Sequence, residues 1–415
     1  MSKKNKQPEL SGLVVVDKPL GVTSHDVVAA VRGELHMRRV GHAGTLDPQA
    51  SGVLVIGFSH GTRLLNYIVD HTKTYEATIR LGQRSTTDDS EGEITTVAPV
   101  RLADGSAQSS SDERDGDPDD VRMLTLHQVE QAIEEHLTGN IQQVPSSYSA
   151  VRVNGRHAYE LARQGKVVEL NARPVTISEF TVLDARNAEA RNNVFDAEKY
   201  ENDTRAGVAS VVDVDVRISC STGTYIRSLG RDLGQLLGVG GYLTKLRRTR
   251  VGKFDLADPQ LAERVVTAHA KPHTFTNREG VTLTLKRAVL DIDADELKRC
   301  ALTMLEAAQR TMPTIPIRDE DAKNLRFGRR LPMILAAGAS AEYGSGAAAE
   351  TDNSAQIVKT ADDKAVTNDG KTSTNTSGTN DIAAVYLPQT EEVVGIVEPA
   401  NSHELKSVVV FPQVG

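Results

Sequence analysis

The chain has 415 residues, a formal net charge of −8 and 39% hydrophobic residues, which is enough to bury a sizeable core and predicts two domains. No run of about twenty apolar residues could span a bilayer, and the first ten residues lack the apolar stretch of a secretory signal, so we expect a cytoplasmic protein without membrane association. The only cysteines, Cys220 and Cys300, lie far apart, without the spacing of a zinc site or a disulfide framework.

The acidic total conceals an uneven distribution of charge. Residues 88–120 hold eleven acidic and two basic residues, whereas residues 217–253 hold eight Lys or Arg against the single acid Asp232. A local basic cluster can follow a phosphate backbone although the whole chain is acidic. A solvated helix face is the alternative explanation of this cluster.

Strands and helices are predicted in turn along the first 230 residues. Residues 12–19 (GLVVVDKP) are apolar and β-rich, and residues 23–35 (TSHDVVAAVRGEL) begin with a capping residue and continue with helical periodicity. Alternating patterns predict strands over residues 73–85, 173–186 and 208–230. Few crossover helices separate them, so we expect an α+β fold with a mixed, largely antiparallel central sheet flanked by helices.

Three polar segments interrupt this pattern, at residues 103–120, 187–206 and 337–380. The first and third have almost no large apolar side chains and cannot offset the entropy lost on ordering. Because β-like sequence returns after residue 380, we expect a small β domain over residues 313–415. A linker near residues 306–315 would join it to a larger domain over residues 10–305.

One carboxylate stands among small, uncharged residues in the segment HAGTLDPQASGVL, residues 42–54. Pro48 restricts Asp47 to extended conformations, which places the carboxylate on a loop. The small neighbours, among them Gly44 and Gly52, allow a large substrate backbone to approach closely. A tight structural turn explains the same residues equally well.

The chain resembles the bacterial tRNA pseudouridine synthase B family in a series of ordered motifs. They include GLVVVDKPLGVTSHDVV, RVGHAGTLDPQASGVLVIGFSHGTRL, KTYEATIRLGQRSTTDDSEGE, CSTGTYIRSLGRDLG and GYLTKLRRTRVGKF. The resemblance implies the pseudouridine synthase fold, a thumb segment over residues 144–174, and a C-terminal PUA-like RNA-binding domain. It also implies conversion of the uridine at position 55, in the TΨC loop of tRNA, to pseudouridine.

This isomerisation breaks the N1–C1′ bond, turns the uracil while it stays bound, and joins C5 to C1′. A single carboxylate can serve as nucleophile or as base, so neither a metal nor another cofactor is implied. The resemblance assigns this role to Asp47, pairs it with Arg227, and places Tyr75 against the flipped base. A guanidinium there would stabilise the ionised carboxylate and fix its rotamer.

The resemblance assigns substrate contacts to four further positions. His42 would fill the space that the flipped base vacates, Tyr225 and Leu246 would contact the substrate, and Lys18 would buttress the site. We expect Tyr225 to share one face of a strand with Arg227. Ordinary strand, core or surface positions are the alternative for each of them.

Basic residues near these motifs are candidates for contacts to the RNA backbone, because like charges close together repel one another without an anion. They are Lys245, Arg247, Arg248, Arg250 and, in the thumb segment, Arg152. Surface ion pairs are the alternative. The acidic run at residues 86–93 fits no standard calcium loop, and we expect its Asp89 to tie a strand to the active-site loop.

Three functions fit the motifs. The first is an enzyme that modifies the T-arm stem-loop of tRNA as a monomer, with no guide RNA. The second is an RNA-binding or RNA-folding protein in which catalysis is secondary or lost, and the third is a guide-RNA-dependent relative. The intact GTLDP motif, together with Tyr75 and Arg227, favours the first.

The composition of residues 337–380 also yields a prediction. Replacing this tract by a short Gly-Ser linker should leave folding and turnover unchanged, because the tract has too few large apolar residues to join a core. Circular dichroism and a turnover assay on the shortened chain would check this. An unfolded product would contradict it.

Overall fold

The computed structural model describes residues 10–103, 122–153, 155–193, 208–276, 280–333 and 382–413. Of the three predicted polar segments, at residues 103–120, 187–206 and 337–380, the parts 104–120 and 194–206 and the whole of the third lie outside these residues.

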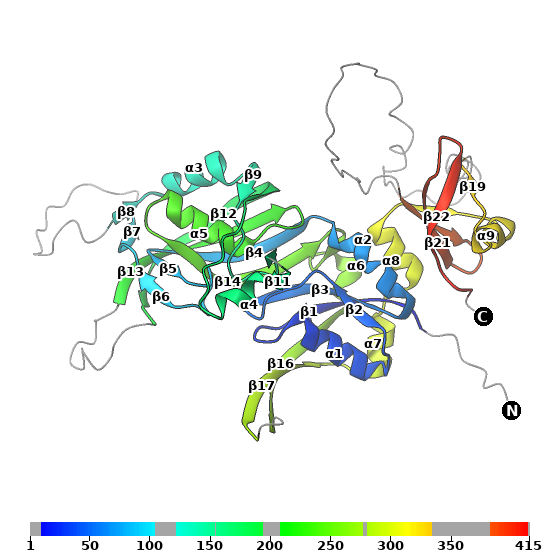
Figure 1. Cartoon of the computed structure of the whole chain (residues 1–415), viewed down its shortest axis with the longest axis horizontal. Coiled ribbons are helices and arrows are strands. Elements are labelled where there is room, and N and C mark those ends of the chain that lie inside the picture. The colour runs from blue at the N-terminus through cyan, green and yellow to red at the C-terminus, as the bar shows by residue number, and fades with distance from the viewer. Residues whose placement is uncertain are drawn as a thin grey trace, which may run out of the picture.

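A twisted sheet forms the body of the molecule (Figure 1). Its strand order is β17-β16-β1-β3-β14-β4-β13-β12-β9, with β2 paired to β3 and β15 paired to β14. The β1–β16 and β3–β14 pairs are parallel and the other pairs antiparallel, which confirms the predicted mixed, largely antiparallel sheet. The strands are β1 (Gly12–Lys18), β2 (Val40–Ala43), β3 (Ala50–Phe58), β4 (Lys73–Leu81), β9 (Gly139–Gln143), β12 (Arg173–Arg191), β13 (Val208–Cys220), β14 (Gly241–Val251), β15 (Phe254–Asp255), β16 (Val265–Thr276) and β17 (Thr282–Leu290).

Helices flank this sheet, and none of the helices in the described ranges is long and apolar enough to cross a membrane. They are α1 (Ser24–Glu34), α2 (Leu65–Val69), α3 (Leu126–His136), α4 (Ala158–Ala162), α5 (Ile226–Leu236), α6 (Pro259–Ala262), α7 (Ala294–Cys300) and α8 (Met304–Thr311), with the 3-10 helix η1 (Ser59–Arg63). Short pairs complete the body: β5 (Gln83–Ser85) with β6 (Ile94–Thr96), β7 (Val100–Leu102) with β8 (Arg122–Leu124), and β10 (Arg152–Val153) with β11 (Arg156–His157).

The first strand and helix form as their sequences predict. β1 buries Val14 and Val16 in the same cluster as Val27 and Val31 of α1. A capping box at Thr23 begins the helix, with the Thr23 side chain and the Asp26 side chain each accepting a backbone N–H of the other. The hydroxyl of the next residue, Ser24, is not used in this cap and bonds to Leu46.

The strand predicted over residues 208–230 is too long. β13 ends at Cys220, a turn follows, and Ile226 begins helix α5. Ile226, Leu229 and Leu233 are buried at helical spacing. This spacing predicts a helix from Ile226 onward, although the residues before it alternate as in a strand. The expectation that Tyr225 and Arg227 share one face of a strand is therefore wrong.

The polar insertion is predicted to begin at residue 187, but β12 continues to Arg191, and its residues from 187 to 191 pair with β13. Polar side chains of this segment accept backbone N–H groups of the short neighbouring strands β6 and β7. The Asn187 side chain accepts the Leu102 N–H at 2.7 Å, and the Asn193 side chain accepts the Ile94 N–H at 2.6 Å. Asparagines that looked like loop residues thus satisfy edge-strand backbone groups.

A separate five-stranded sheet lies at the C-terminal end, in the order β18-β20-β21-β22-β19 (Figure 1). Its elements are β18 (Thr314–Pro316), α9 (Asp319–Arg326), β19 (Leu331–Pro332), β20 (Ala383–Leu387), β21 (Glu392–Pro399) and β22 (Glu404–Val410). This agrees with the predicted small C-terminal β unit.

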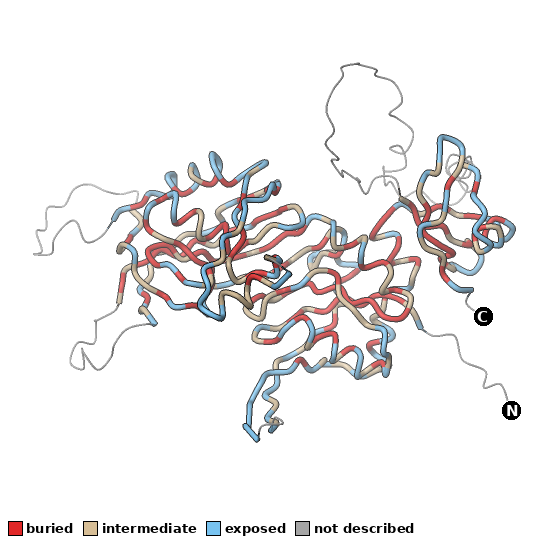
Figure 2. Tube along the Cα trace, in the orientation of Figure 1, coloured by how far each residue is buried: buried red, intermediate tan, exposed pale blue. Residues whose placement is uncertain are grey.

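The predicted linker at residues 306–315 is largely helical instead. α8 covers Met304–Thr311, and Leu305 and Ala308 are buried in one cluster with Ile396 and Phe411 of the C-terminal unit. Buried residues continue from the body through α8 to the C-terminal sheet in Figure 2. The periodic apolar positions of α8 carry a core that both parts share.

This shared core predicts that the two parts unfold together. Ile396→Ala should lower the free energy of unfolding by about 2–4 kcal/mol, because it removes a fully buried side chain at the junction. Urea denaturation followed by circular dichroism would show one transition at lower urea. Val408→Ala, at a position that is 44% exposed, should change little, and two separate transitions would contradict a shared core.

Candidate active site

Asp47 lies on the loop between β2 and β3, and backbone contacts fix this loop. The Ser24 hydroxyl accepts the Leu46 N–H at 2.8 Å and donates to the Leu46 carbonyl at 3.0 Å. The Gly21 N–H donates to the Pro48 carbonyl at 2.8 Å. Both neighbours of Asp47 are thus tied to the start of α1, while the Asp47 carboxylate is 43% exposed.

Arg248 holds the same loop from below. Its side chain is 1% exposed and donates to the carbonyls of Val53 at 2.9 Å, Gly44 at 3.1 Å and Thr45 at 3.4 Å. Strands β3 and β14 come so close here that a Cβ on Gly52, whose φ is +105°, would lie 2.1 Å from the Arg248 carbonyl oxygen. The expectation that Arg248 contacts RNA phosphate is therefore wrong, because its guanidinium is enclosed and already bonded.

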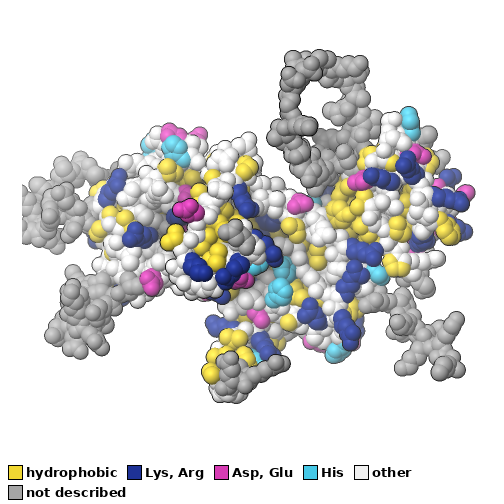
Figure 3. Space-filling view, viewed as in Figure 1, with side chains coloured by type: hydrophobic (Ala, Val, Ile, Leu, Met, Phe, Trp, Pro, Cys, Tyr) yellow, Lys and Arg dark blue, Asp and Glu magenta, His cyan; other side chains and the backbone are white. Residues whose placement is uncertain are grey.

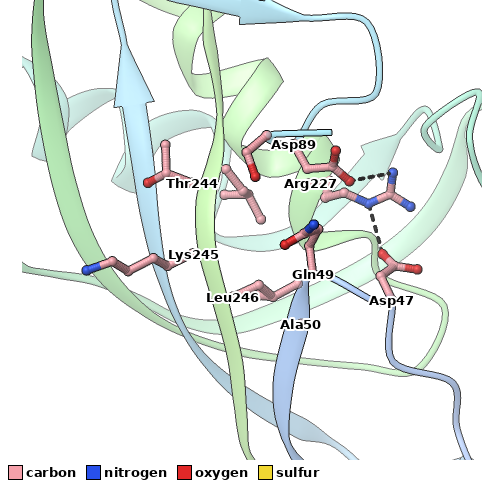
Figure 4. Close-up of a pocket in the computed structure, with 10 residues that line it drawn as sticks. Asp47, Gln49, Ala50, Asp89, Arg227, Thr244, Lys245 and Leu246 are labelled. Carbon is pink, nitrogen blue, oxygen red and sulfur yellow. Dashed lines mark ion pairs between the residues drawn. The ribbon is translucent and has the colours of Figure 1, made fainter. Parts of the chain in front are cut away.

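Arg227 pairs with Asp47, as Figure 4 shows. Its Nε lies 3.0 Å from Asp47 Oδ2, and its Nη1 lies 3.4 Å from Asp89 Oδ2. It also donates to the carbonyls of Thr87 and Tyr148, each at 2.9 Å. With a side chain that is 8% exposed, Arg227 spends its donors on four partners and holds the carboxylate in one rotamer.

Asp89 is fixed in turn by its own neighbours. Its Oδ1 accepts the Thr87 hydroxyl at 2.5 Å and the Glu91 N–H at 3.0 Å, which leaves Oδ2 for Arg227. The expected tie to the active-site loop exists, but it runs through Arg227. The structure therefore forms a chain from Asp89 through Arg227 to Asp47.

A pocket opens beside the linked side chains of Asp89, Arg227 and Asp47, and both charged and apolar residues line it (Figure 4). Its lining residues are Asp47, Gln49, Ala50, Asp89, Ser90, Arg227, Leu243, Thr244, Lys245 and Leu246. The two predicted contacts Leu246 and Lys245 therefore lie at the pocket. An apolar surface next to an ionised carboxylate suits a flat, polar-edged ring.

Tyr75 lies beside the pocket and is not among its lining residues. It is 8% exposed and shares a buried cluster with Leu46 and Ala50. In the sheet it is the direct cross-strand neighbour of Arg248. Burial raises the pKa of Tyr75, opposed by the positive charge of Arg248. The structure thus brings Tyr75 next to the loop, with little of its side chain exposed.

His42 and Lys18 flank the loop on the side of α1. Burial lowers the pKa of His42, as do the neighbouring His25 and Arg248, which favours the neutral imidazole. Lys18 is fully buried, and its Nζ donates to the carbonyls of Pro19 at 2.9 Å and Val22 at 2.8 Å. Burial lowers the pKa of Lys18 to about 8, against the attraction of Asp47. Lys18 is thus bonded within the turn that adjoins the Asp47 loop.

The backbone of Tyr225 is clamped by a side-chain amide that the sequence did not single out. Gln143, which is 1% exposed, accepts the Tyr225 N–H at 2.8 Å and donates to the Tyr225 carbonyl at 3.1 Å. This clamp fixes the backbone of the residue that precedes α5, two residues before Arg227. A glutamine within a strand carries no local signal of such a role.

The other predicted phosphate contacts are placed differently from one another. Arg247 forms a bidentate pair with Asp17 at 2.7 and 2.9 Å, and Arg250 donates to the Thr74 hydroxyl at 3.0 Å. Lys245 and Arg152 are exposed. Within the described ranges no three His, Cys, Asp or Glu side chains gather as metal ligands.

Comparisons with known proteins agree with one another. Residues 32–226 match the model described as TruB family pseudouridylate synthase (N terminal domain), and residues 227–294 match the tRNA pseudouridylate synthase B C-terminal domain. The chain is 46% identical to tRNA pseudouridine synthase B of Bifidobacterium longum (strain DJO10A), over 97% of this chain and 98% of that protein. It is 40% identical to the protein of that name from Mycobacterium tuberculosis (strain CDC 1551 / Oshkosh), over 74% and 85% of the two chains.

A structural comparison supports the fold. A chain in the crystal structure of a Cbf5-Nop10-Gar1 complex superposes with a TM-score of 0.53 and 19% identity, covering 100% of this chain and 92% of that chain.

The enclosure of Arg248 yields a prediction about stability. Arg248→Met should lower the free energy of unfolding by at least about 2 kcal/mol, because buried carbonyls of the loop lose their donors. Arg250→Met on the same strand, which removes one bond to a hydroxyl, should cost less than about 1 kcal/mol. Urea denaturation would compare the two, and equal costs would contradict the anchoring role.

Proposed function

This chain belongs to the TruB family of pseudouridylate synthases, and we propose that it converts the uridine at position 55, in the TΨC loop of tRNA, to pseudouridine. The proposal includes action as a monomer on free tRNA in the cytoplasm, without a guide RNA or a cofactor. The observation that carries it is the Asp47 carboxylate, partly exposed at a pocket and held by the buried Arg227.

The pair suits an isomerisation, which leaves the composition of the nucleotide unchanged. Asp47 would act as nucleophile or base while the N1–C1′ bond breaks, and the detached uracil would turn within the pocket before C5 joins C1′. C5 then releases its hydrogen as a proton to solvent, and N1 takes up a proton in exchange. Arg227 would keep the carboxylate aimed at the substrate, because two of its other donors are bound to backbone carbonyls and hold the guanidinium in place. Both residues would act without a proton relay from His42.

A uridine inside a folded loop must leave its stack to reach Asp47, which costs a few kcal/mol. Leu246 and Ala50 offer the base an apolar surface in the pocket. Tyr75, which lies beside the pocket, would stack on the base, and base–aromatic stacking returns about 1–3 kcal/mol. His42 would fill the space left in the RNA, and Tyr225 would contact the substrate beside Arg227.

The remaining parts would hold the tRNA. We assign the thumb to residues 144–174, with Arg152 on an exposed hairpin, and the catalytic domain to residues 10–305. The C-terminal sheet, within residues 313–415, would be a PUA-like RNA-binding domain. Lys245 at the pocket would be an exposed cation for phosphate, and the half-buried Arg250 near the end of β14 would be a second contact.

Two alternatives make different predictions for a bare T-arm stem-loop. A binding protein without catalysis would bind the stem-loop and leave it unmodified. A guide-dependent enzyme would modify it only with a guide RNA and partner proteins. Turnover by the purified chain alone would distinguish the proposal from both.

Asp47→Asn tests the proposal most directly. Tritium release from C5-labelled uridine in the stem-loop should fall below detection, because the amide can neither attack nor accept a proton, while binding measured by filter retention persists. Glu91→Gln is a matched control, since Glu91 is an exposed carboxylate that accepts from the pocket residue Gln49 at 2.9 Å. Turnover that survives Asp47→Asn, or that is lost equally in the control, would overturn the assignment.

A further inference from the structure

The β16–β17 hairpin extends far beyond the sheet. β16 pairs in parallel with β1 only from Val265 to Thr267, and then continues for nine residues to Thr276. At about 3.3 Å per residue this is roughly 30 Å past the last pair with β1. Figure 1 shows the hairpin projecting beside α1, and Figure 2 shows its outer part exposed.

The hairpin projects from the end of the sheet that carries the candidate active site. β1 ends at Lys18, and the turn that follows bonds through Gly21 to Pro48, next to Asp47. The Lys286 side chain of β17 lies over this turn, since a Cβ on Gly21 would be 3.1 Å from its Nζ. The base of the hairpin therefore adjoins the Asp47 loop.

One face of the hairpin carries an unusual set of cross-strand neighbours, which we call the arm strip. It comprises Lys271, His273, Phe275, Leu283, Leu285 and Arg287. Lys271 pairs directly with Arg287, and both are exposed. Like charges in that arrangement destabilise a strand pair. In the described parts of β16 and β17, from residue 265 to 276 and from 280 to 290, no acidic residue offsets them.

Beyond these cations the strip is aromatic and apolar. The rings of His273 and Phe275 stack with centroids 5.9 Å apart, and Leu285, opposite His273, is 56% exposed. Hydrophobic side chains gather on the projecting hairpin in Figure 3. A two-stranded ribbon gains little from its own contacts, so a repelling and apolar face is a cost until something covers it.

We propose that the arm strip binds the tRNA substrate outside its T arm. Paired cations suit backbone phosphates, and the stacked rings with Leu285 suit exposed sugar and base surfaces. The inference rests on the proposed function, because a tRNA held at Asp47 brings the rest of the same molecule within reach of a 30 Å arm. At that effective concentration even weak contacts strengthen binding.

The test compares two RNAs and one double variant of the full chain. Lys271→Ala with Arg287→Ala should weaken binding of full-length tRNA about tenfold and reduce the slope of log Kd against log salt by about two, because two phosphate contacts are lost. Binding and turnover of the T-arm stem-loop should not change. Lys298→Ala with Arg299→Ala is the matched control, since it removes two exposed cations from the neighbouring helix α7.

Each other outcome overturns a specific statement. Equal losses on both RNAs, or no loss on either, would overturn the arm strip as a site for the outer tRNA, and the second result would indicate a protein partner instead. If the α7 control loses as much affinity for full-length tRNA as the arm-strip variant, the loss reflects general surface charge and the arm strip is not a specific site. Absence of turnover by the unmodified chain on the stem-loop would refute the proposed function itself.

Discussion

The site depends on one buried cation. Arg227 lies in the first turn of α5, where the helix dipole disfavours a positive charge, and its side chain is 8% exposed. Such a group is stable only when its donors are satisfied, and here the partners come from separate parts of the chain. Asp47, Asp89 and the carbonyls of Thr87 and Tyr148 must all be in place at once. The position of the exposed carboxylate is therefore a property of the whole fold.

Two arginines divide the work around Asp47. Arg227 contacts the carboxylate itself, while Arg248 donates to backbone carbonyls on both sides of Asp47 in the sequence, those of Gly44 and Val53. Ser24 and Lys18 complete the backbone contacts from the α1 side, the first at Leu46 and the second within the turn that precedes the helix. A loop with so many backbone contacts has little freedom to move when substrate charge changes. This favours electrostatic preorganisation over closure of the loop itself.

Local pattern predicts the elements better than it predicts their roles. β1, α1 and Asp47 follow from a short apolar run, a capping residue and a proline, all of which act over a few residues. Arg247 and Arg248 are adjacent in one basic run, yet one is paired at the surface and the other is enclosed, because β14 alternates its faces. The helix α8 likewise replaces a predicted linker, because residues that cover its apolar side come from the distant C-terminal sheet. Which side a residue faces depends on strands that arrive from distant parts of the sequence.

The distribution of charge explains why binding and chemistry need different cations. Lys18, Arg227 and Arg248 surround Asp47, but their donors are spent on carbonyls and carboxylates of the protein. They therefore stabilise the loop and the carboxylate without offering much to a phosphate. An acidic chain that must hold a polyanion then has to place exposed cations beyond this inner ring. Lys245 at the pocket occupies such a position, and so do Lys271 and Arg287 on the arm strip.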